Sequence, residues 1–146
     1  MNIQIQPMTQ QDLKQIEEIL TTDFDEFWTP SIFEKELNNP NSSYFVAKQK
    51  NQIVGFGGIW KAVDDIHITN LVTKKNMRNL GIAKQILDKL IQTAKQTKLA
   101  SLTLEVNENN LPAIDLYEKF GFQKLGIRKK YYNNQDNAII MTLYFT

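Results

Sequence analysis

The chain has 146 residues, of which 42% are hydrophobic and 23% are charged, so it can form a folded domain and is not broadly disordered. Its 17 basic and 16 acidic residues leave a net charge of +1, which gives no general case for nucleic-acid binding. Cysteine is absent, which excludes disulfides, thiolate metal sites and a cysteine nucleophile. The sequence has neither a signal-peptide pattern nor an apolar run that would span a bilayer. We expect a single domain over residues 1–146, located in the cytoplasm.

The first half of the chain combines extended segments with two short helices. Thr9 caps the first predicted helix, which carries apolar residues from Leu13 to Leu20 on one side, and Pro30 starts the second. Between them, residues 23–29 are both acidic and aromatic, and their carboxylates are candidates for attracting a basic substrate. The predicted strands cover residues 3–7, 44–47, 53–60 and 66–72, with a hairpin turn at Lys50 and Asn51.

The second half predicts two further helices and three further strands. A helix over residues 80–96 has an apolar stripe, and the strand after it alternates apolar residues with polar ones, among them Glu105. Asn110 caps the next helix, and Gly121 ends it. The last two strands are predicted at residues 122–132 and 137–145, around a turn at Asn133 and Asn134. Hairpins together with one strand–helix–strand crossover predict an α/β (α+β) fold.

The segment that joins the strand at residues 66–72 to the following helix carries the clearest functional signal. It reads Arg78-Asn79-Leu80-Gly81-Ile82-Ala83, followed by Lys84. The first turn of a helix has unpaired N–H groups and the positive end of the helix dipole, so it binds phosphate well. Gly81 removes a side chain where a ligand would approach the backbone closely. A plain strand-to-helix connection, with Gly81 present for the turn alone, explains the same residues.

Four features in this order resemble the GNAT acetyltransferase superfamily: this loop, the strand with Leu104-Glu105-Val106, the cap Asn110, and residues 116–122. In the loop, Arg78, Gly81 and Ala83 match the superfamily's pyrophosphate-binding pattern. The closer resemblance is to the RimI-type ribosomal-protein-alanine N-acetyltransferases, and it extends to Phe27-Trp28, Phe33, Leu37, Ala113-Ile114, Arg128, Tyr131-Tyr132 and residues 136–141. Asn79 and Leu80 depart from the basic residues that the family often has there, and Lys74-Lys75 depart from its common Asp-Pro.

The resemblance implies the GNAT fold, a mixed and mostly antiparallel central sheet with helices on both faces. It implies acetyl transfer from acetyl-CoA to an amine, namely the N-terminal alanine of a ribosomal small-subunit protein, by direct attack. Glu105 takes the place of the family's general base, and Tyr117 takes the place of its general acid. The residues that take the place of its cofactor-binding residues are Leu71, Val72, Thr73, Arg78, Asn79, Leu80, Gly81, Ile82, Ala83, Lys84 and Asn110. No metal, membrane or nucleic-acid partner is expected.

This chemistry needs both an acid and a base. A peptide α-amine has a pKa near ~8 and is substantially protonated at neutral pH, while the leaving thiolate needs a proton that a phenol with a pKa near ~10 can supply. Each residue also has a structural explanation. Glu105 fits the solvent side of a strand, Tyr117 fits an apolar helix stripe, and Asn110 fits a helix cap. His67, the only histidine, is an alternative base.

Three other functions fit the same sequence. The first is a GNAT enzyme that acts on another protein N-terminus, a small-molecule amine or a charged tRNA. The second is a non-catalytic acyl-CoA-binding module, against which the presence of Glu105 and Tyr117 argues. The third is a structural domain without a cofactor. Acceptor specificity is expected in the loops around residues 23–31 and 127–136.

Overall fold

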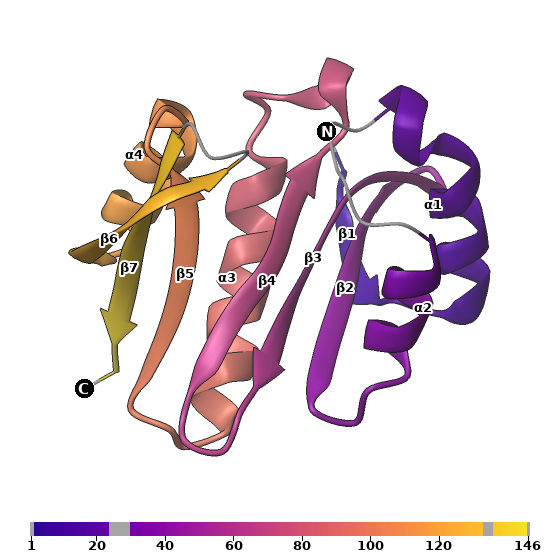
Figure 1. Cartoon of the computed structure of the whole chain (residues 1–146). Coiled ribbons are helices and arrows are strands. Elements are labelled where there is room, and N and C mark those ends of the chain that lie inside the picture. Colours follow the sequence, from indigo (N-terminus) through magenta and orange to yellow (C-terminus); the bar gives the residue numbers. More distant parts are fainter. Residues whose placement is uncertain (1, 24–29, 133–135, 146) are drawn as a thin grey trace.

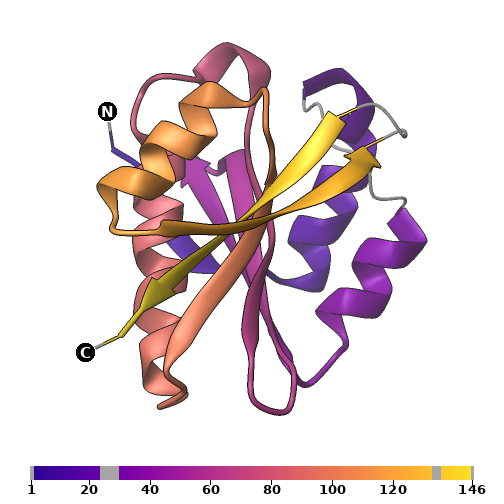
Figure 2. The same cartoon turned by 60° about the vertical axis from the view of Figure 1, so that its left-hand side comes forward.

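The computed structural model describes residues 2–23, 30–132 and 136–145. These residues form a seven-stranded sheet in the order β1-β2-β3-β4-β5-β7-β6, with helices on both faces (Figure 1, Figure 2). The strands are β1 (Gln4–Pro7), β2 (Ser42–Gln49), β3 (Gln52–Lys61), β4 (Ile66–Thr73), β5 (Ser101–Asn107), β6 (Gln123–Tyr132) and β7 (Asp136–Tyr144). The helices are α1 (Gln10–Asp23), α2 (Pro30–Leu37), a 3-10 helix (Lys75–Met77), α3 (Ile82–Gln96) and α4 (Leu111–Lys119).

The sheet is mixed and mostly antiparallel, as predicted. Neighbouring strands run antiparallel except β4 and β5, which run parallel and are joined by the α3 crossover. The helices α3 and α4 pack on one face, and α1 and α2 pack on the other (Figure 2). No helix among the described residues is long and apolar enough to cross a bilayer.

Local sequence signals account for several of these elements. The β2–β3 hairpin turns at Lys50 and Asn51, which have φ angles of 50° and 67°, as a two-residue type I′ turn requires. Asn110 caps α4, since its Oδ1 accepts a hydrogen bond from the Ala113 amide at 3.3 Å. The predicted turn at Asn133 and Asn134 and most of the acidic, aromatic segment (residues 24–29) lie outside the described residues.

The start of α3 differs from the prediction. The helix begins at Ile82 rather than at Leu80, because Gly81 has a φ of 81° and Asn79 has a φ of 65°. A left-handed residue cannot continue a right-handed helix, so Gly81 becomes the residue before its first turn. The short 3-10 helix before this point was not predicted either.

A buried ion pair attaches α1 to the sheet. Asp12 accepts a hydrogen bond from the Thr9 amide at 2.9 Å and a salt bridge from Lys48 Nζ of β2 at 2.7 Å. The Asp12 amide in turn donates to Thr9 Oγ1 at 3.1 Å, which completes a reciprocal helix cap. Burial raises the pKa of Asp12, but the bonds from Lys48 and Thr9 outweigh it and hold this pKa below its usual value.

The close approach of α3 to β3 depends on glycine. A Cβ atom at Gly57 would lie 2.8 Å from Ile86 Cγ2 of α3 and 3.1 Å from the Asn70 carbonyl oxygen of β4. Ile86 is fully buried, so it has little room to move. Gly57 therefore allows α3 to approach β3 closely.

We predict that Gly57→Ala lowers the free energy of unfolding by about 1–3 kcal/mol, because it overpacks the contact with Ile86. Urea denaturation followed by circular dichroism measures this change. Gly126→Ala in β6 is the control, since its new Cβ would meet Ile140 Cδ1 at an ordinary 3.8 Å. Equal stability of the two variants would show that the α3–β3 contact is not tight.

Candidate active site

The two parallel strands at the centre of the sheet separate along their length. The only described pairing between β4 and β5 joins His67 and Thr103, near the start of both strands. Beyond it, β4 stays paired with β3 as far as Thr73, and β5 stays paired with β7 as far as Asn107. Figure 1 shows the two strands diverging toward their C-terminal ends. Backbone groups on the facing edges of β4 and β5 are thus left available to a ligand.

The phase of the β4 backbone identifies which groups face this separation. The Lys74 amide donates to the Val54 carbonyl of β3 at 2.8 Å. Because successive residues of a strand direct their backbone groups to opposite edges, Val72 also faces β3. Leu71 and Thr73 then face β5. A register shift at Gly58 and Ile59 leaves Thr69 as an extra residue of β4, so this strand bulges where the separation begins.

The loop before α3 brings several predicted residues to the surface. Gly81 has no atom within 4 Å of where a Cβ would lie, and Arg78, Asn79, Leu80 and Lys84 are exposed. Ile82 is buried and anchors the helix, so only its backbone can face a ligand. A hollow of about 620 Å³ includes Gly81 and Lys84 among its lining residues. The first-turn amides of α3 open beside it, which suits an anionic ligand.

Glu105 lies on the face of β5 opposite to the core. Its neighbours Leu104 and Val106 are buried, whereas the Glu105 side chain is 25% exposed. Glu105 Oε1 lies 2.8 Å from Nη2 of Arg128, which extends from β6 across the intervening β7. The prediction that Glu105 occupies the polar side of its strand is confirmed, and the contact with Arg128 was not predicted.

Tyr117 has the core contacts that its helical stripe predicted. It is 7% exposed, and its ring packs edge-on against Phe122 with centroids 5.5 Å apart. Tyr117 lies on α4, whose cap is Asn110. The structural explanations of Tyr117 and Asn110 therefore hold. The catalytic role of Tyr117 and the cofactor-binding role of Asn110 stay predictions.

A polar cluster on the Glu105 side of the sheet was missed by sequence reasoning. Tyr44 of β2 shares a hydrogen bond of 2.8 Å with Thr69 at the bulge, and burial raises the pKa of Tyr44 to about 12. The neighbouring Asn70 is buried, and its Nδ2 has no hydrogen-bond partner in the structure as described. Gly58 makes room for the Tyr44 ring, which a Cβ there would approach to 2.4 Å. The only sequence signal was a polar pair inside an apolar strand.

The alternative base His67 lies beside Trp60, with ring centroids 6.2 Å apart. Within the described ranges, no three His, Asp or Glu side chains gather as metal ligands would. His67 thus has an aromatic neighbour that accounts for its position.

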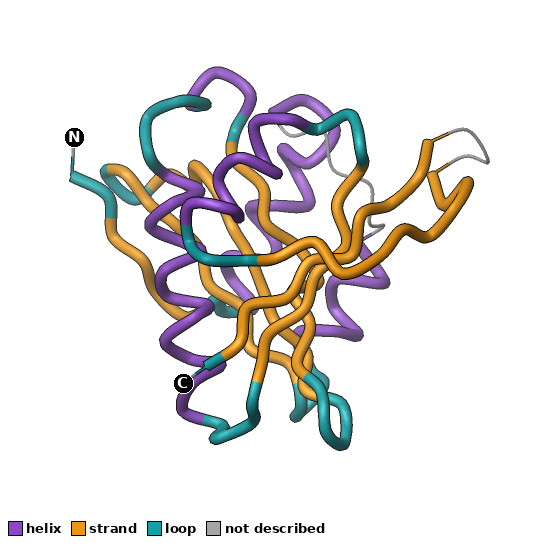
Figure 3. The backbone as a smooth tube through the Cα atoms, turned by 90° about the vertical axis from the view of Figure 1, so that its left-hand side faces the viewer, coloured by secondary structure: helices purple, strands orange, loops and turns teal. Residues whose placement is uncertain are grey.

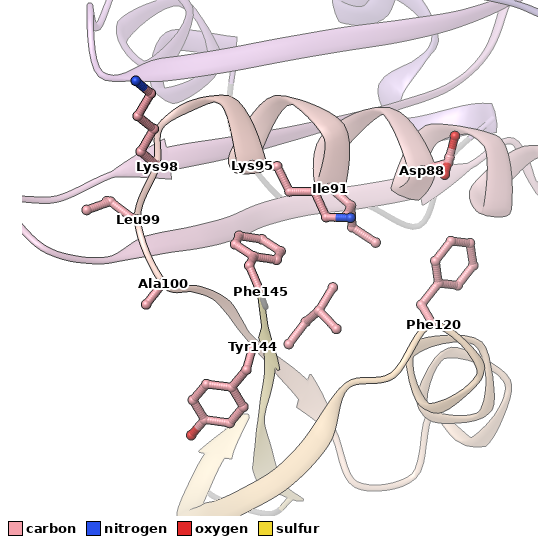
Figure 4. Close-up of a pocket in the computed structure, with 10 residues that line it drawn as sticks. Asp88, Ile91, Lys95, Lys98, Leu99, Ala100, Phe120, Tyr144 and Phe145 are labelled. Atoms are coloured by element: carbon pink, nitrogen blue, oxygen red, sulfur yellow. The ribbon is translucent and has the colours of Figure 1, made fainter.

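A second hollow, of about 630 Å³, lies between α3, the end of α4 and the end of β7 (Figure 4). Phe120 and Phe145 point toward α3 in Figure 4, and Lys95 Nζ lies 5.9 Å from the Phe145 ring centroid. None of the predicted site residues lines this hollow. The separation of β4 and β5, with the loop before α3, is therefore the better candidate site.

Comparison with known proteins agrees with this assignment. Residues 13–122 match the Acetyltransferase (GNAT) family. A Bacillus subtilis (strain 168) protein, provisionally assigned as a ribosomal protein bS18-alanine N-acetyltransferase, is 35% identical over 139 residues, which cover 94% of this chain and 92% of the relative.

Solved structures share the fold over nearly the whole chain. The crystal structure of the ribosomal-protein-S18-alanine N-acetyltransferase from Escherichia coli superposes with a TM-score of 0.89 at 25% identity, covering 99% of this chain and 95% of the other. A GNAT family acetyltransferase from Elizabethkingia anophelis with acetyl-CoA bound has a TM-score of 0.78 at 22% identity and covers 99% of both chains. The family match, the close relative and the separated strands agree: this chain belongs to the GNAT family and is an acetyl-CoA-dependent N-acetyltransferase.

Proposed function

We propose that this chain, acting as one domain in the cytoplasm, acetylates the N-terminal alanine of a ribosomal protein. The observation that carries the proposal is the 35% identity to the Bacillus subtilis relative, which extends over almost the full length of both proteins. Similarity over the whole length includes the segments from which acceptor specificity is expected. The Escherichia coli structure, whose name specifies the same acceptor, supports the proposal.

We infer that acetyl-CoA binds at the separated strands and at the loop before α3. Leu71 and Thr73 present their backbone groups to the separation, and Gly81 leaves open space beside the first-turn amides of α3. These features fit an extended ligand that ends in phosphates. When bound, acetyl-CoA supplies the activated acetyl thioester. A backbone N–H of β4 would then stabilise negative charge on the thioester oxygen.

Residues 78–84 contribute to the proposed binding of acetyl-CoA in different ways. Arg78 and Lys84 contribute positive charge, whereas Asn79, Leu80, Ile82 and Ala83 contribute backbone groups and shape. Val72 supports β4 from the β3 side, and its side chain packs against the core beneath α1. Asn110 approaches the cofactor from the start of α4 in this proposal.

Glu105 is the general base of the proposed reaction. An acceptor ammonium must lose a proton before its nitrogen can attack, and Glu105 is the carboxylate on the open side of the separating strands. Tyr117 is the general acid that protonates the departing thiolate. Its packing against Phe122 fixes the direction of the ring, which keeps the hydroxyl in place.

We predict that Gly81→Glu weakens acetyl-CoA binding about tenfold or more, because it adds bulk and negative charge at the phosphate position. Isothermal titration calorimetry on the folded variant measures this affinity. Val63→Glu is the control, because it introduces the same charge at a distant position. Val63 is 90% exposed in the turn before β4. Unchanged affinity in Gly81→Glu would place the cofactor away from this loop.

The experiment that tests the proposed function measures CoA release with four peptides. One begins with Ala, one with Met and one with acetyl-Ala, and the fourth offers only a Lys side-chain amine. We expect the Ala peptide to be preferred and the acetylated peptide to be inactive. Preference for Met or for the Lys amine would assign the chain another acceptor.

The same assay with Glu105→Gln tests the base. Turnover of the Ala peptide should fall by about 10²–10⁴-fold at neutral pH, with little change in acetyl-CoA affinity. The deficit should shrink at high pH, where the acceptor amine is already neutral. Full activity of Glu105→Gln at pH 7 would exclude this carboxylate and favour His67.

We predict that Tyr117→Phe loses turnover at saturating substrates while its melting temperature changes little. The substitution keeps the ring and its contact with Phe122, so packing is preserved, but the proton donor is removed. Turnover and thermal unfolding are measured side by side. A variant with near-normal turnover would mean that Tyr117 serves the core alone.

A further inference from the structure

The contact between Glu105 and Arg128 spans three strands. Glu105 of β5 lies opposite Ile140 of β7, and Arg128 of β6 lies opposite Ala138 of the same strand. The guanidinium therefore reaches diagonally over β7 to place Nη2 at 2.8 Å from Oε1. This reach is long for an ion pair on a sheet, because each strand adds about 4.8 Å.

Arg128 is the one ion-pair partner of Glu105 among the described residues. The Glu105 side chain is 25% exposed, so solvent reaches part of it. A glutamate also has several rotatable bonds between its backbone and its oxygens. Fixing one carboxylate oxygen restricts the position of the other.

We propose that Arg128 is a positioning residue, which holds Oε1 of Glu105 so that Oε2 faces the acceptor amine. The proposal rests on the proposed function, in which Glu105 is the base. The proton lost by the acceptor ammonium goes to Oε2, while Oε1 keeps its hydrogen bond from the guanidinium. A general base must lie within hydrogen-bond reach of the proton that it takes, and a displacement of about 1 Å can reduce the rate about 10²-fold.

Two other roles of Arg128 predict different behaviour. A residue that binds the acceptor directly would change KM and would act independently of Glu105. If the ion pair has no catalytic role, its loss would change neither kcat nor KM. It would also change stability little, since exposed pairs contribute little to it. Arg128 is 54% exposed, so its substitution should leave the fold intact under each of the three roles.

The test is a double-mutant cycle with Arg128→Met, Glu105→Gln and the double variant. In the wild-type background, Arg128→Met should lower kcat by roughly 10–100-fold, with unchanged melting temperature and acetyl-CoA affinity. In the Glu105→Gln background, the same substitution should have no further effect, because Arg128 acts through Glu105. Arg128→Lys should recover part of the activity, since an ammonium can bind one carboxylate oxygen.

Lys124→Met is the matched control. Lys124 lies on the same strand β6, outside the segments from which acceptor specificity is expected. It is exposed and has no ion pair with Glu105 in the described structure, so its loss should leave kcat near the wild-type value. The substitution removes the same charge from the same strand. A similar loss of kcat in Lys124→Met would show that general charge, not the contact with Glu105, explains the effect.

The remaining outcomes separate this proposal from the proposed function. Losses that multiply in the double variant, a change confined to KM, or full activity of Arg128→Met would each overturn the positioning role while leaving the base in place. Full activity of Glu105→Gln, or no acetyl transfer by the wild type, would overturn the proposed mechanism and the positioning role together.

Discussion

The site depends on the separation of β4 and β5. Each strand is paired along its outer edge, β4 with β3 and β5 with β7, while the one described pairing between them joins His67 and Thr103. The bulge at Thr69 bends β4 where this pairing stops. Unpaired backbone groups inside a protein are unfavourable unless a partner meets them. Because the sheet opens at its centre, backbone donors and acceptors of β4 and β5 remain available to bind a ligand.

This separation connects the two faces of the sheet. The α3 and α4 face supplies most of the core and the loop that contains Gly81. The opposite face carries Glu105 and, beside it, Thr103, whose hydroxyl lies 2.9 Å from that of Thr142. Figure 3 shows strands β6 and β7 bending toward this second face. In the proposed reaction, the cofactor enters from the helix side and the acceptor from the polar side, so the two meet where β4 and β5 separate.

The sequence predicted elements that depend on local periodicity or on turn chemistry. The alternation around Glu105, the apolar stripe of α3 and the turn at Lys50 and Asn51 each specify their element within a few residues. The start of α3 was predicted too early, because a left-handed φ at Gly81 is not visible in an apolar pattern.

Contacts between strands that are distant in the sequence could not be predicted from local patterns. The pair of Glu105 and Arg128 requires the strand order β5-β7-β6, in which the last strand along the chain lies between two earlier ones. The bond between Tyr44 and Thr69 likewise depends on a bulge that shifts the register of β4. Nothing in the residues near Arg128 indicates that its charge would reach Glu105, because this depends on topology rather than on local pattern.

Observed structural roles and proposed chemical roles coincide at several positions of the site, as the precision that catalysis needs would require. Asn110 caps α4 at the point where it would meet the cofactor, and Gly81 adopts the left-handed backbone that opens α3 beside the phosphate position. Tyr117 packs against Phe122 in the core, so its ring direction is fixed before any substrate binds. Groups held in this way lose little entropy when the reaction occurs. In the proposed reaction, burial of Tyr117 aims its hydroxyl, whereas the more exposed Glu105 is positioned by its contact with Arg128.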